Sequence, residues 1–174
     1  MSPKRHSAKL MLLGDIGVGK TSLAKRLVFD RFDGDYKTTI GVDVLTYDIA
    51  LGAACNNETL RLVLWDTDGD FGQAIFSSMY VVGAAGAIVV ADATRPSSFE
   101  RIGSILRIFQ ERFPGRPAKA IVNKIDLLAP GSADRALALS DLPGADIMRA
   151  SALTGEGVVE LFRSIAQTIW RRSS

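Results

Sequence analysis

The residues best suited to chemistry lie early in the chain, in a glycine-rich stretch that ends in a lysine and a threonine. This stretch, Gly14–Thr21, has the spacing Gly-x-x-x-x-Gly-Lys-Thr and is called the phosphate loop below. Its glycines allow successive backbone N–H groups to face one anion, while Lys20 suits the β- and γ-phosphates and Thr21 suits Mg²⁺. We expect contacts to a nucleotide from Gly17, Val18, Gly19, Lys20, Thr21 and Ser22.

A second polar group follows the apolar run at residues 118–122 and reads Asn123-Lys124-Ile125-Asp126. A carboxylate such as Asp126 accepts two hydrogen bonds from a base with two adjacent N–H donors, which guanine has and adenine lacks. Further along, Ser151, Ala152 and Leu153 form a small-residue segment, called the base loop below. Its backbone N–H groups suit the guanine oxygen. The pattern favours guanine, bound by Asn123, Lys124, Asp126 and the base loop.

Candidates for sensing a γ-phosphate lie between these motifs. Thr39 stands in a polar segment and offers a hydroxyl to complete a Mg²⁺ shell only when the γ-phosphate is present. Asp66 ends the strand-like run at residues 60–65, and its carboxylate is a third metal ligand beside Thr21 and Thr39. The backbone N–H of Gly69 can approach phosphate closely because no side chain intervenes.

With these motifs in this order, the chain resembles the small GTPases of the Ras superfamily and has features of the Rab branch. The resemblance runs from about residue 9 to residue 170. The matching segments are Gly14–Thr21, Thr38–Asp43, Trp65–Thr67, Asn123–Asp126 and Ser151–Ala152. It implies an α/β fold of the P-loop NTPase G-domain type, with a six-stranded, mostly parallel sheet flanked by helices and one antiparallel strand pair.

The same resemblance implies further roles. Phe32 packs against guanine, Tyr36 closes over the phosphates, and Thr39 and Gly69 tether the γ-phosphate. Release of those tethers after hydrolysis changes which effector or regulator proteins bind at the switch segments. Part of the effector surface of Rab-like proteins corresponds to Val44, Trp65 and Tyr80, with Val44 in place of a phenylalanine. Core packing explains Trp65 equally well.

The chain departs from the family around the catalytic position, where Asp-Thr-Ala-Gly-Gln becomes Asp66-Thr67-Asp68-Gly69-Asp70. A glutamine accepts from the attacking water and donates toward the transition state, whereas ionised Asp70 only accepts and adds negative charge. In the phosphate loop, Ile16 places a β-branched side chain where the family usually has a small residue, and it narrows the space there. We expect Lys20, Thr39, Gly69 and Asp70 around the reacting phosphate.

From these departures we predict slow GTP hydrolysis, at or below the order of 10⁻⁴ s⁻¹. Two alternatives stay open: Gln73 orients the water and the rate is ordinary, or the chain is a GTPase-like scaffold with negligible hydrolysis, held in one nucleotide state. An ATP-dependent phosphotransferase is a distant third possibility, disfavoured by Asn123–Asp126.

Length and composition fit one G domain over residues 1–174, with 47% hydrophobic residues and a net charge of +2. The pI near 8.8 is weak evidence for nucleic acid or membrane, and we expect neither as a direct partner. Cys55 is the single cysteine, so we expect a reducing, cytoplasmic setting and no lipid anchor in this chain, with membrane reached only through a partner. We expect a monomer.

The elements that position these residues follow from hydrophobic periodicity and turn signals. Strands are predicted at residues 8–13, 43–51, 59–65, 85–91, 118–122 and 147–149. Helices are predicted at residues 21–29, 74–82, 99–112, 133–140 and 158–171. The second and third strands are joined by a short turn and are expected to be antiparallel, and Ser97 or Ser98 is expected to cap the third helix.

Overall fold

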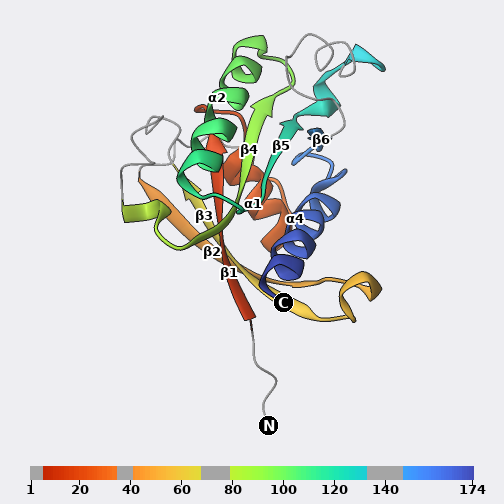
Figure 1. Ribbon diagram of the computed structural model, residues 1–174. Coiled ribbons are helices and arrows are strands. Elements are labelled where there is room, and N and C mark those ends of the chain that lie inside the picture. The colour runs from red at the N-terminus through yellow and green to blue at the C-terminus, as the bar shows by residue number, and fades with distance from the viewer. Residues whose placement is uncertain (1–5, 35–40, 68–78, 133–146) are drawn as a thin grey trace.

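A six-stranded sheet organises the protein. The computed structural model describes residues 6–34, 41–67, 79–132 and 147–174. The strands are β1 (His6–Gly14), β2 (Val42–Ala50), β3 (Thr59–Thr67), β4 (Ala84–Asp92), β5 (Ala118–Asn123) and β6 (Ile147–Arg149). Their order is β2-β3-β1-β4-β5-β6 (Figure 1). Only β2 and β3 pair antiparallel among these strands, which confirms the predicted mixed α/β sheet.

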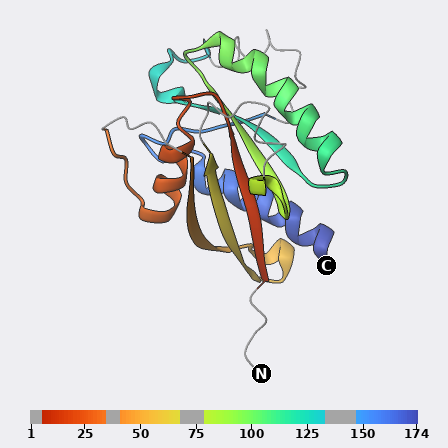
Figure 2. The ribbon, with the colours of Figure 1, turned by 90° about the vertical axis from the view of Figure 1, so that its left-hand side faces the viewer.

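Helices cover both faces of this sheet (Figure 2). The described helices are α1 (Lys20–Phe29), α2 (Pro96–Arg112) and α4 (Val158–Ser173), with 3-10 turns at Ala53–Cys55, Met79–Val81 and Ile125–Leu127. Alternate β1 residues explain the two layers: Leu10 and Leu12 join the core under α1 and α4, whereas Met11 and Leu13 join the core under α2. No helix within the described residues is long and apolar enough to cross a membrane.

The parallel strands end at one edge of the sheet, and α1 begins there (Figure 1). Because β1, β4 and β5 run parallel, they end at the same edge: Asp92 pairs with Asn123 in the strand register, and Gly14 pairs with Val90, two residues before Asp92. Ligands of open α/β sheets bind at this carboxyl edge. The fold therefore collects the phosphate loop and the predicted guanine residues in one place.

One capping prediction is wrong, and two helix predictions lie mostly or wholly outside the described residues. Ser97 and Ser98 do not cap α2, because the helix begins at Pro96 with Arg95 at the N-cap and no side-chain cap. Ser98 Oγ instead accepts from the Asp92 N–H and donates to the Arg95 carbonyl. The predicted helix at residues 74–82 lies mostly outside the described residues, and its described end is the 3-10 turn. The predicted helix at residues 133–140 lies outside them entirely.

Candidate functional site

The backbone of the phosphate loop is shaped for glycine where it meets β4 and β5. Gly14 has a φ of 141°, and a Cβ there would lie 2.4 Å from the Val90 carbonyl oxygen. Gly19 has a φ of 100°, and a Cβ there would lie 2.2 Å from the Asn123 amide nitrogen. Any other residue would need positive φ and would displace its neighbour. The loop thus lies directly against the end of β5, where the predicted guanine residues begin.

Lys20 lies inside the loop. Its side chain is buried, and its ammonium donates to the carbonyls of Gly14 at 2.8 Å and Asp15 at 2.7 Å. Its charge is therefore fixed at the start of α1, where the helix dipole also favours an anion.

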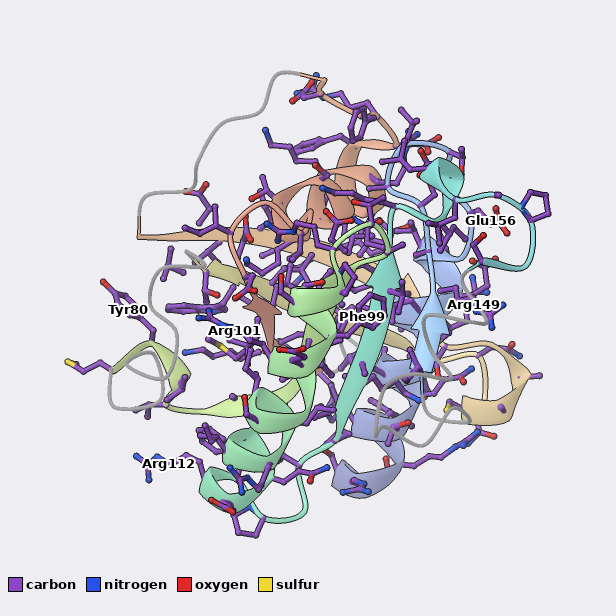
Figure 3. The ribbon with its side chains drawn as sticks, turned by 90° about the horizontal axis from the view of Figure 1, so that it is seen from above. Tyr80, Phe99, Arg101, Arg112, Arg149 and Glu156 are labelled. Carbon is purple, nitrogen blue, oxygen red and sulfur yellow. The ribbon has the colours of Figure 1, made fainter. Side chains whose placement is uncertain are left out.

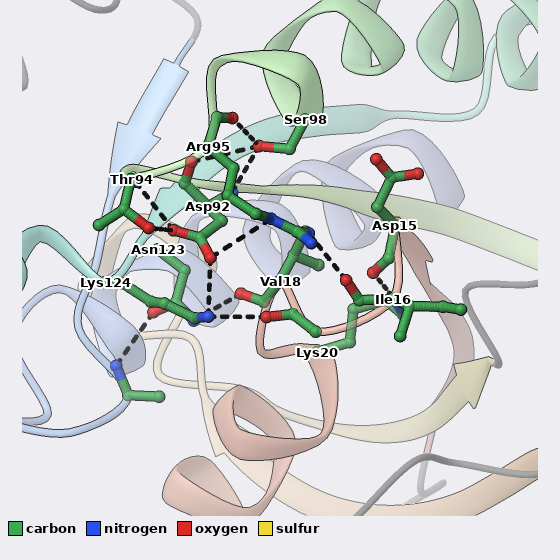
Figure 4. A network of polar contacts seen from close by, with 12 residues as sticks. Asp15, Ile16, Val18, Lys20, Asp92, Thr94, Arg95, Ser98, Asn123 and Lys124 are labelled. Atoms are coloured by element: carbon green, nitrogen blue, oxygen red, sulfur yellow. Dashed lines mark hydrogen bonds and ion pairs between the residues drawn. The ribbon is translucent and has the colours of Figure 1, made fainter. Parts of the chain in front are cut away.

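The outer side of the loop is held by side chains from other elements (Figure 4). They are Arg95 on the Ile16 carbonyl at 2.7 Å, Lys124 on the Gly17 carbonyl at 2.7 Å, and Asn123 on the Val18 carbonyl at 3.0 Å. In a trans peptide the C=O and the following N–H point in opposite directions. The next N–H groups in the chain therefore face away from these donors, into the loop, which is the arrangement of an anion-binding nest.

Asp66 is a buried carboxylate at the end of β3. Its side chain is 1% exposed; Oδ2 accepts from the Thr21 hydroxyl, while Oδ1 has no hydrogen-bond partner among the described residues. Burial raises the pKa of Asp66, although the Thr21 hydrogen bond and the charge of Lys20 oppose this shift. An unsatisfied buried carboxylate oxygen is costly unless it gains a partner such as a cation.

The residues around Asp66 fit Mg²⁺. No group of three histidine, cysteine, aspartate or glutamate side chains that could hold a metal occurs in the described part of the chain. Mg²⁺ does not need one, because it is usually bound through one or two carboxylates, waters and substrate phosphates. The Thr21 hydroxyl and the open Oδ1 of Asp66 are hard oxygen donors of this kind.

The predicted guanine residues also come together. Asn123 is buried, and its Oδ1 accepts from the Ala152 N–H at 3.1 Å. The Asp126 carboxylate accepts from the Ser151 hydroxyl at 2.6 Å. Lys124 has a φ of 67°, which turns the chain sharply after β5 and leads into the 3-10 turn that carries Asp126. The base loop and the Asn123–Asp126 turn therefore share one hydrogen-bonded framework.

Sequence reasoning missed Asp92, which contacts Lys124 and Arg95, two of the side chains that hold the phosphate loop. It is buried at the end of β4 and accepts from Lys124 at 2.7 Å and from the Thr94 hydroxyl at 2.7 Å, and Arg95 Nε lies 3.6 Å away. Burial opposes ionisation, but the hydrogen bonds from Lys124 and Thr94 outweigh it and lower the pKa of Asp92. A polar residue at the end of an apolar strand was the available signal, as it was for Asn123.

Two further arginines near the site were also missed, and no periodicity marks either of them. Arg101 on α2 forms an ion pair of 2.6 Å with the Asp15 carboxylate (Figure 3 labels Arg101). Arg26 on α1 contacts the base loop. Both contacts join residues far apart in sequence, so local patterns carry no signal for them.

The remaining predicted residues divide into two groups. Phe32 and Leu153 are described and expose much of their surface. Tyr36, Thr39, Asp68, Gly69, Asp70 and Gln73 lie outside the described residues, so their predicted roles stay predictions.

The three residues that the resemblance assigns to an effector surface, Val44, Trp65 and Tyr80, lie next to one another. Val44 and Trp65 pair across β2 and β3, and the Trp65 and Tyr80 ring centroids lie 6.3 Å apart. Val44 and Tyr80 are exposed. The Lys9 ammonium lies 3.6 Å from the Trp65 ring centroid, so a cation covers one face of that ring.

Comparisons with known proteins extend across this whole site. The model of the Ras family matches residues 9–171. The GTP-binding protein ypt3 of Schizosaccharomyces pombe is 33% identical over 166 residues, covering 94% of this chain and 76% of that protein. The Ras-related protein RABF2b of Arabidopsis thaliana is 36% identical over 171 residues, covering 97% and 84%. The human Ras-related protein Rab-31 is 34% identical over 168 residues, covering 92% and 82%.

Proposed function

The chain belongs to the Ras family of GTP-binding switch proteins and is similar to Rab proteins, and from this premise we propose that it binds GDP and GTP with Mg²⁺ and hydrolyses GTP slowly. One observation carries the magnesium part of the proposal: Asp66 Oδ1 is buried and has no hydrogen-bond partner in the described residues, beside the Thr21 hydroxyl. Mg²⁺ would supply positive charge to the phosphates there. Thr39 is the third proposed ligand.

The phosphates are proposed to lie in the nest formed behind Ile16, Gly17 and Val18, with Lys20 beside them. Because side chains hold the outer carbonyls of the loop, the N–H groups that follow these carbonyls face the opposite way, into the nest. An anion therefore needs little rearrangement of the loop before binding. Ser22 follows in the first turn of α1, where the helix dipole adds to the same attraction.

Guanine is proposed to bind between the Asn123–Asp126 turn and the base loop. Asp126 accepts from the base N1–H and the exocyclic amine, and the base loop donates the Leu153 N–H to the C6 oxygen. Phe32 is proposed to pack against the ring, and Tyr36 to close over the phosphates. The hydrogen bond from Ser151 holds Asp126 in place for this role.

Slow hydrolysis is proposed from the chemistry of three residues. Asp70 replaces a glutamine, and an ionised carboxylate cannot donate to the transition state. Asp68 adds a second negative charge. The half-buried β-branched side chain of Ile16 occupies a loop position that is usually small. Lys20 and the two proposed γ-phosphate tethers, Thr39 and Gly69, remain available for the reaction.

Single-turnover GTP hydrolysis with Mg²⁺ tests this proposal in the native chain and in Asp70→Gln. We expect native turnover at or below the order of 10⁻⁴ s⁻¹ and a rise of about tenfold or more with glutamine, equal to about 1.4 kcal/mol of barrier. Asp48→Asn is the matched control, because Asp48 lies on β2 and pairs with Arg61 away from the site.

Two other outcomes separate the alternatives. Ordinary native turnover that Asp70→Gln leaves unchanged would show that another residue, such as Gln73, orients the water. Tight GTP binding with no turnover in either variant would favour the scaffold held in one nucleotide state.

Effector or regulator proteins are proposed to bind beside the switch segments, on the surface formed by Val44, Trp65 and Tyr80. Val44 replaces a large aromatic residue, so this surface offers less apolar area than its Rab counterpart. A partner selected by the GTP-bound state is expected to lose affinity when Trp65 is replaced by alanine.

A further inference from the structure

Arg26 of α1 contacts the base loop from the side of the helix. Its side chain is only 15% exposed, although arginine is rarely buried. Nε donates to the Ala152 carbonyl at 2.8 Å, and a terminal nitrogen donates to the Leu153 carbonyl. The other terminal nitrogen donates to the Asp30 carbonyl at 3.2 Å, at the end of its own helix. The guanidinium is thus shared between α1 and the base loop.

These contacts fix the direction of the loop peptides. Because C=O and N–H point in opposite directions across a trans peptide, holding the Ala152 carbonyl toward Arg26 turns the Leu153 N–H away from it. The preceding N–H, that of Ala152, donates toward Asn123, which lies against the phosphate loop. Both N–H groups therefore face away from α1: that of Ala152 is bonded to Asn123, and that of Leu153 is the one left for the base.

Only arginine suits this position. Its planar fork offers five donors in fixed directions, so one side chain holds two successive carbonyls and the end of α1 together. A lysine at residue 26 would supply a single rotating ammonium and could not hold all three oxygens in the same geometry.

We propose that Arg26 is a positioning residue for guanine recognition: it holds the Ala152 and Leu153 carbonyls so that the N–H of Leu153, which follows the held Ala152 carbonyl, meets the C6 oxygen of guanine. The inference rests on the proposed function, since it assumes that guanine binds beside the base loop. It assigns Arg26 no contact with the nucleotide.

Equilibrium binding of GDP, inosine diphosphate and 6-thioguanosine diphosphate tests the proposal in the native chain, Arg26→Ala and Arg26→Lys. Inosine keeps the C6 oxygen and lacks the exocyclic amine, whereas 6-thioguanosine keeps the amine and replaces that oxygen by sulfur, a weaker acceptor. The ligand pair therefore separates the C6 contact from the contact with Asp126.

We expect Arg26→Ala to weaken GDP and inosine diphosphate by about tenfold each, equal to about 1.4 kcal/mol. Binding of 6-thioguanosine diphosphate should change by less than about threefold, so the preference for oxygen over sulfur at C6 falls while the preference for the amine is retained. Arg26→Lys keeps the charge and the aliphatic stem and is expected to show the same change in preference.

Arg163→Ala is the matched control. Arg163 Nε donates to the Ala50 carbonyl at 3.2 Å, so this variant also removes an arginine–carbonyl contact between distant segments, away from the site. It is expected to leave all three affinities within about twofold.

Equal weakening of all three nucleotides by Arg26→Ala and Arg26→Lys would overturn the proposal, because it would mean that Arg26 only supports α1 or the fold. Unchanged binding in both variants would also overturn it. Failure of the proposed function looks different: the native chain itself would then bind ADP as tightly as GDP.

Discussion

The proposed phosphate end and the proposed base end of the site are held in different ways. At the phosphate end, the carbonyls of Ile16, Gly17 and Val18 are each held by a different side chain, two of them cationic. At the base end, the Ala152 and Leu153 carbonyls share one arginine, Arg26. Support at the phosphate end is therefore distributed, and support at the base end is concentrated.

This difference matches the chemistry of the two ligand groups. A phosphate chain is a diffuse charge that many N–H groups and cations attract together, so the loss of one donor leaves the others. A base is distinguished by a few directional hydrogen bonds, and a lost partner leaves a buried group unpaired. Single substitutions are therefore expected to have larger effects on base selection than on phosphate binding.

The largest expected effect is at Asp126. We predict that Asp126→Ala weakens GDP by about 10³-fold or more and leaves the weak binding of ADP within about threefold, because adenine lacks the donors that this carboxylate accepts. Leu127→Ala is the control, since Leu127 is an exposed neighbour in the same 3-10 turn. Calorimetric titration of both diphosphates measures the change. A loss of GDP affinity below tenfold would mean that recognition of the base does not depend mainly on this carboxylate.

A smaller effect is expected at Asp66, where one substitution should weaken Mg²⁺ binding and stabilise the nucleotide-free fold. We predict that Mg²⁺ slows GDP release from the native chain but not from Asp66→Asn, because an amide is a poorer metal ligand than a carboxylate. In nucleotide-free protein the same variant should raise the thermal midpoint by about 2–4 °C for each kcal/mol recovered, because it removes a buried charge. Fluorescent GDP release with and without Mg²⁺, and thermal unfolding, measure the two effects. A lowered midpoint together with retained Mg²⁺ dependence would contradict both.

The pH dependence of nucleotide-free protein follows from the same residue. Because burial raises the pKa of Asp66 above its unfolded value, the folded state binds this proton more readily than the unfolded state. The contribution of Asp66 to stability therefore rises as pH falls through the raised pKa and is lost as pH rises above it. Asp66→Asn should flatten this part of the profile relative to the native chain, as measured by unfolding at several pH values. Matching native and variant profiles would show that Asp66 does not titrate there.

The sequence predicted the residues of the base end better than it predicted the residue that holds them in place. The strand ends, the phosphate loop and the Asn123–Asp126 turn were predictable because apolar runs followed by polar residues mark the carboxyl edge of a parallel sheet. Arg26 was not predictable, because its partners are 126 and 127 residues away and arginine is common on helix surfaces. The prediction that a serine caps α2 was wrong, because the helix starts at Pro96 without a side-chain cap. The Ser98 hydroxyl accepts from the Asp92 N–H instead.

The smallest expected effect is at Arg95. We predict that Arg95→Gln speeds GDP release by about three- to tenfold, because one charge-assisted hydrogen bond to the phosphate loop is lost while Lys124 and Asn123 still hold their own carbonyls. Arg101→Gln is the matched control: its arginine contacts the same loop through the Asp15 side chain and is 62% exposed, so we expect less than about twofold. Release of fluorescent GDP measures both. An unchanged rate of GDP release in Arg95→Gln, or a change larger than the one caused by Asp126→Ala, would mean that support at the phosphate end is not distributed. A loop held by several donors should respond to the loss of one of them, and only modestly.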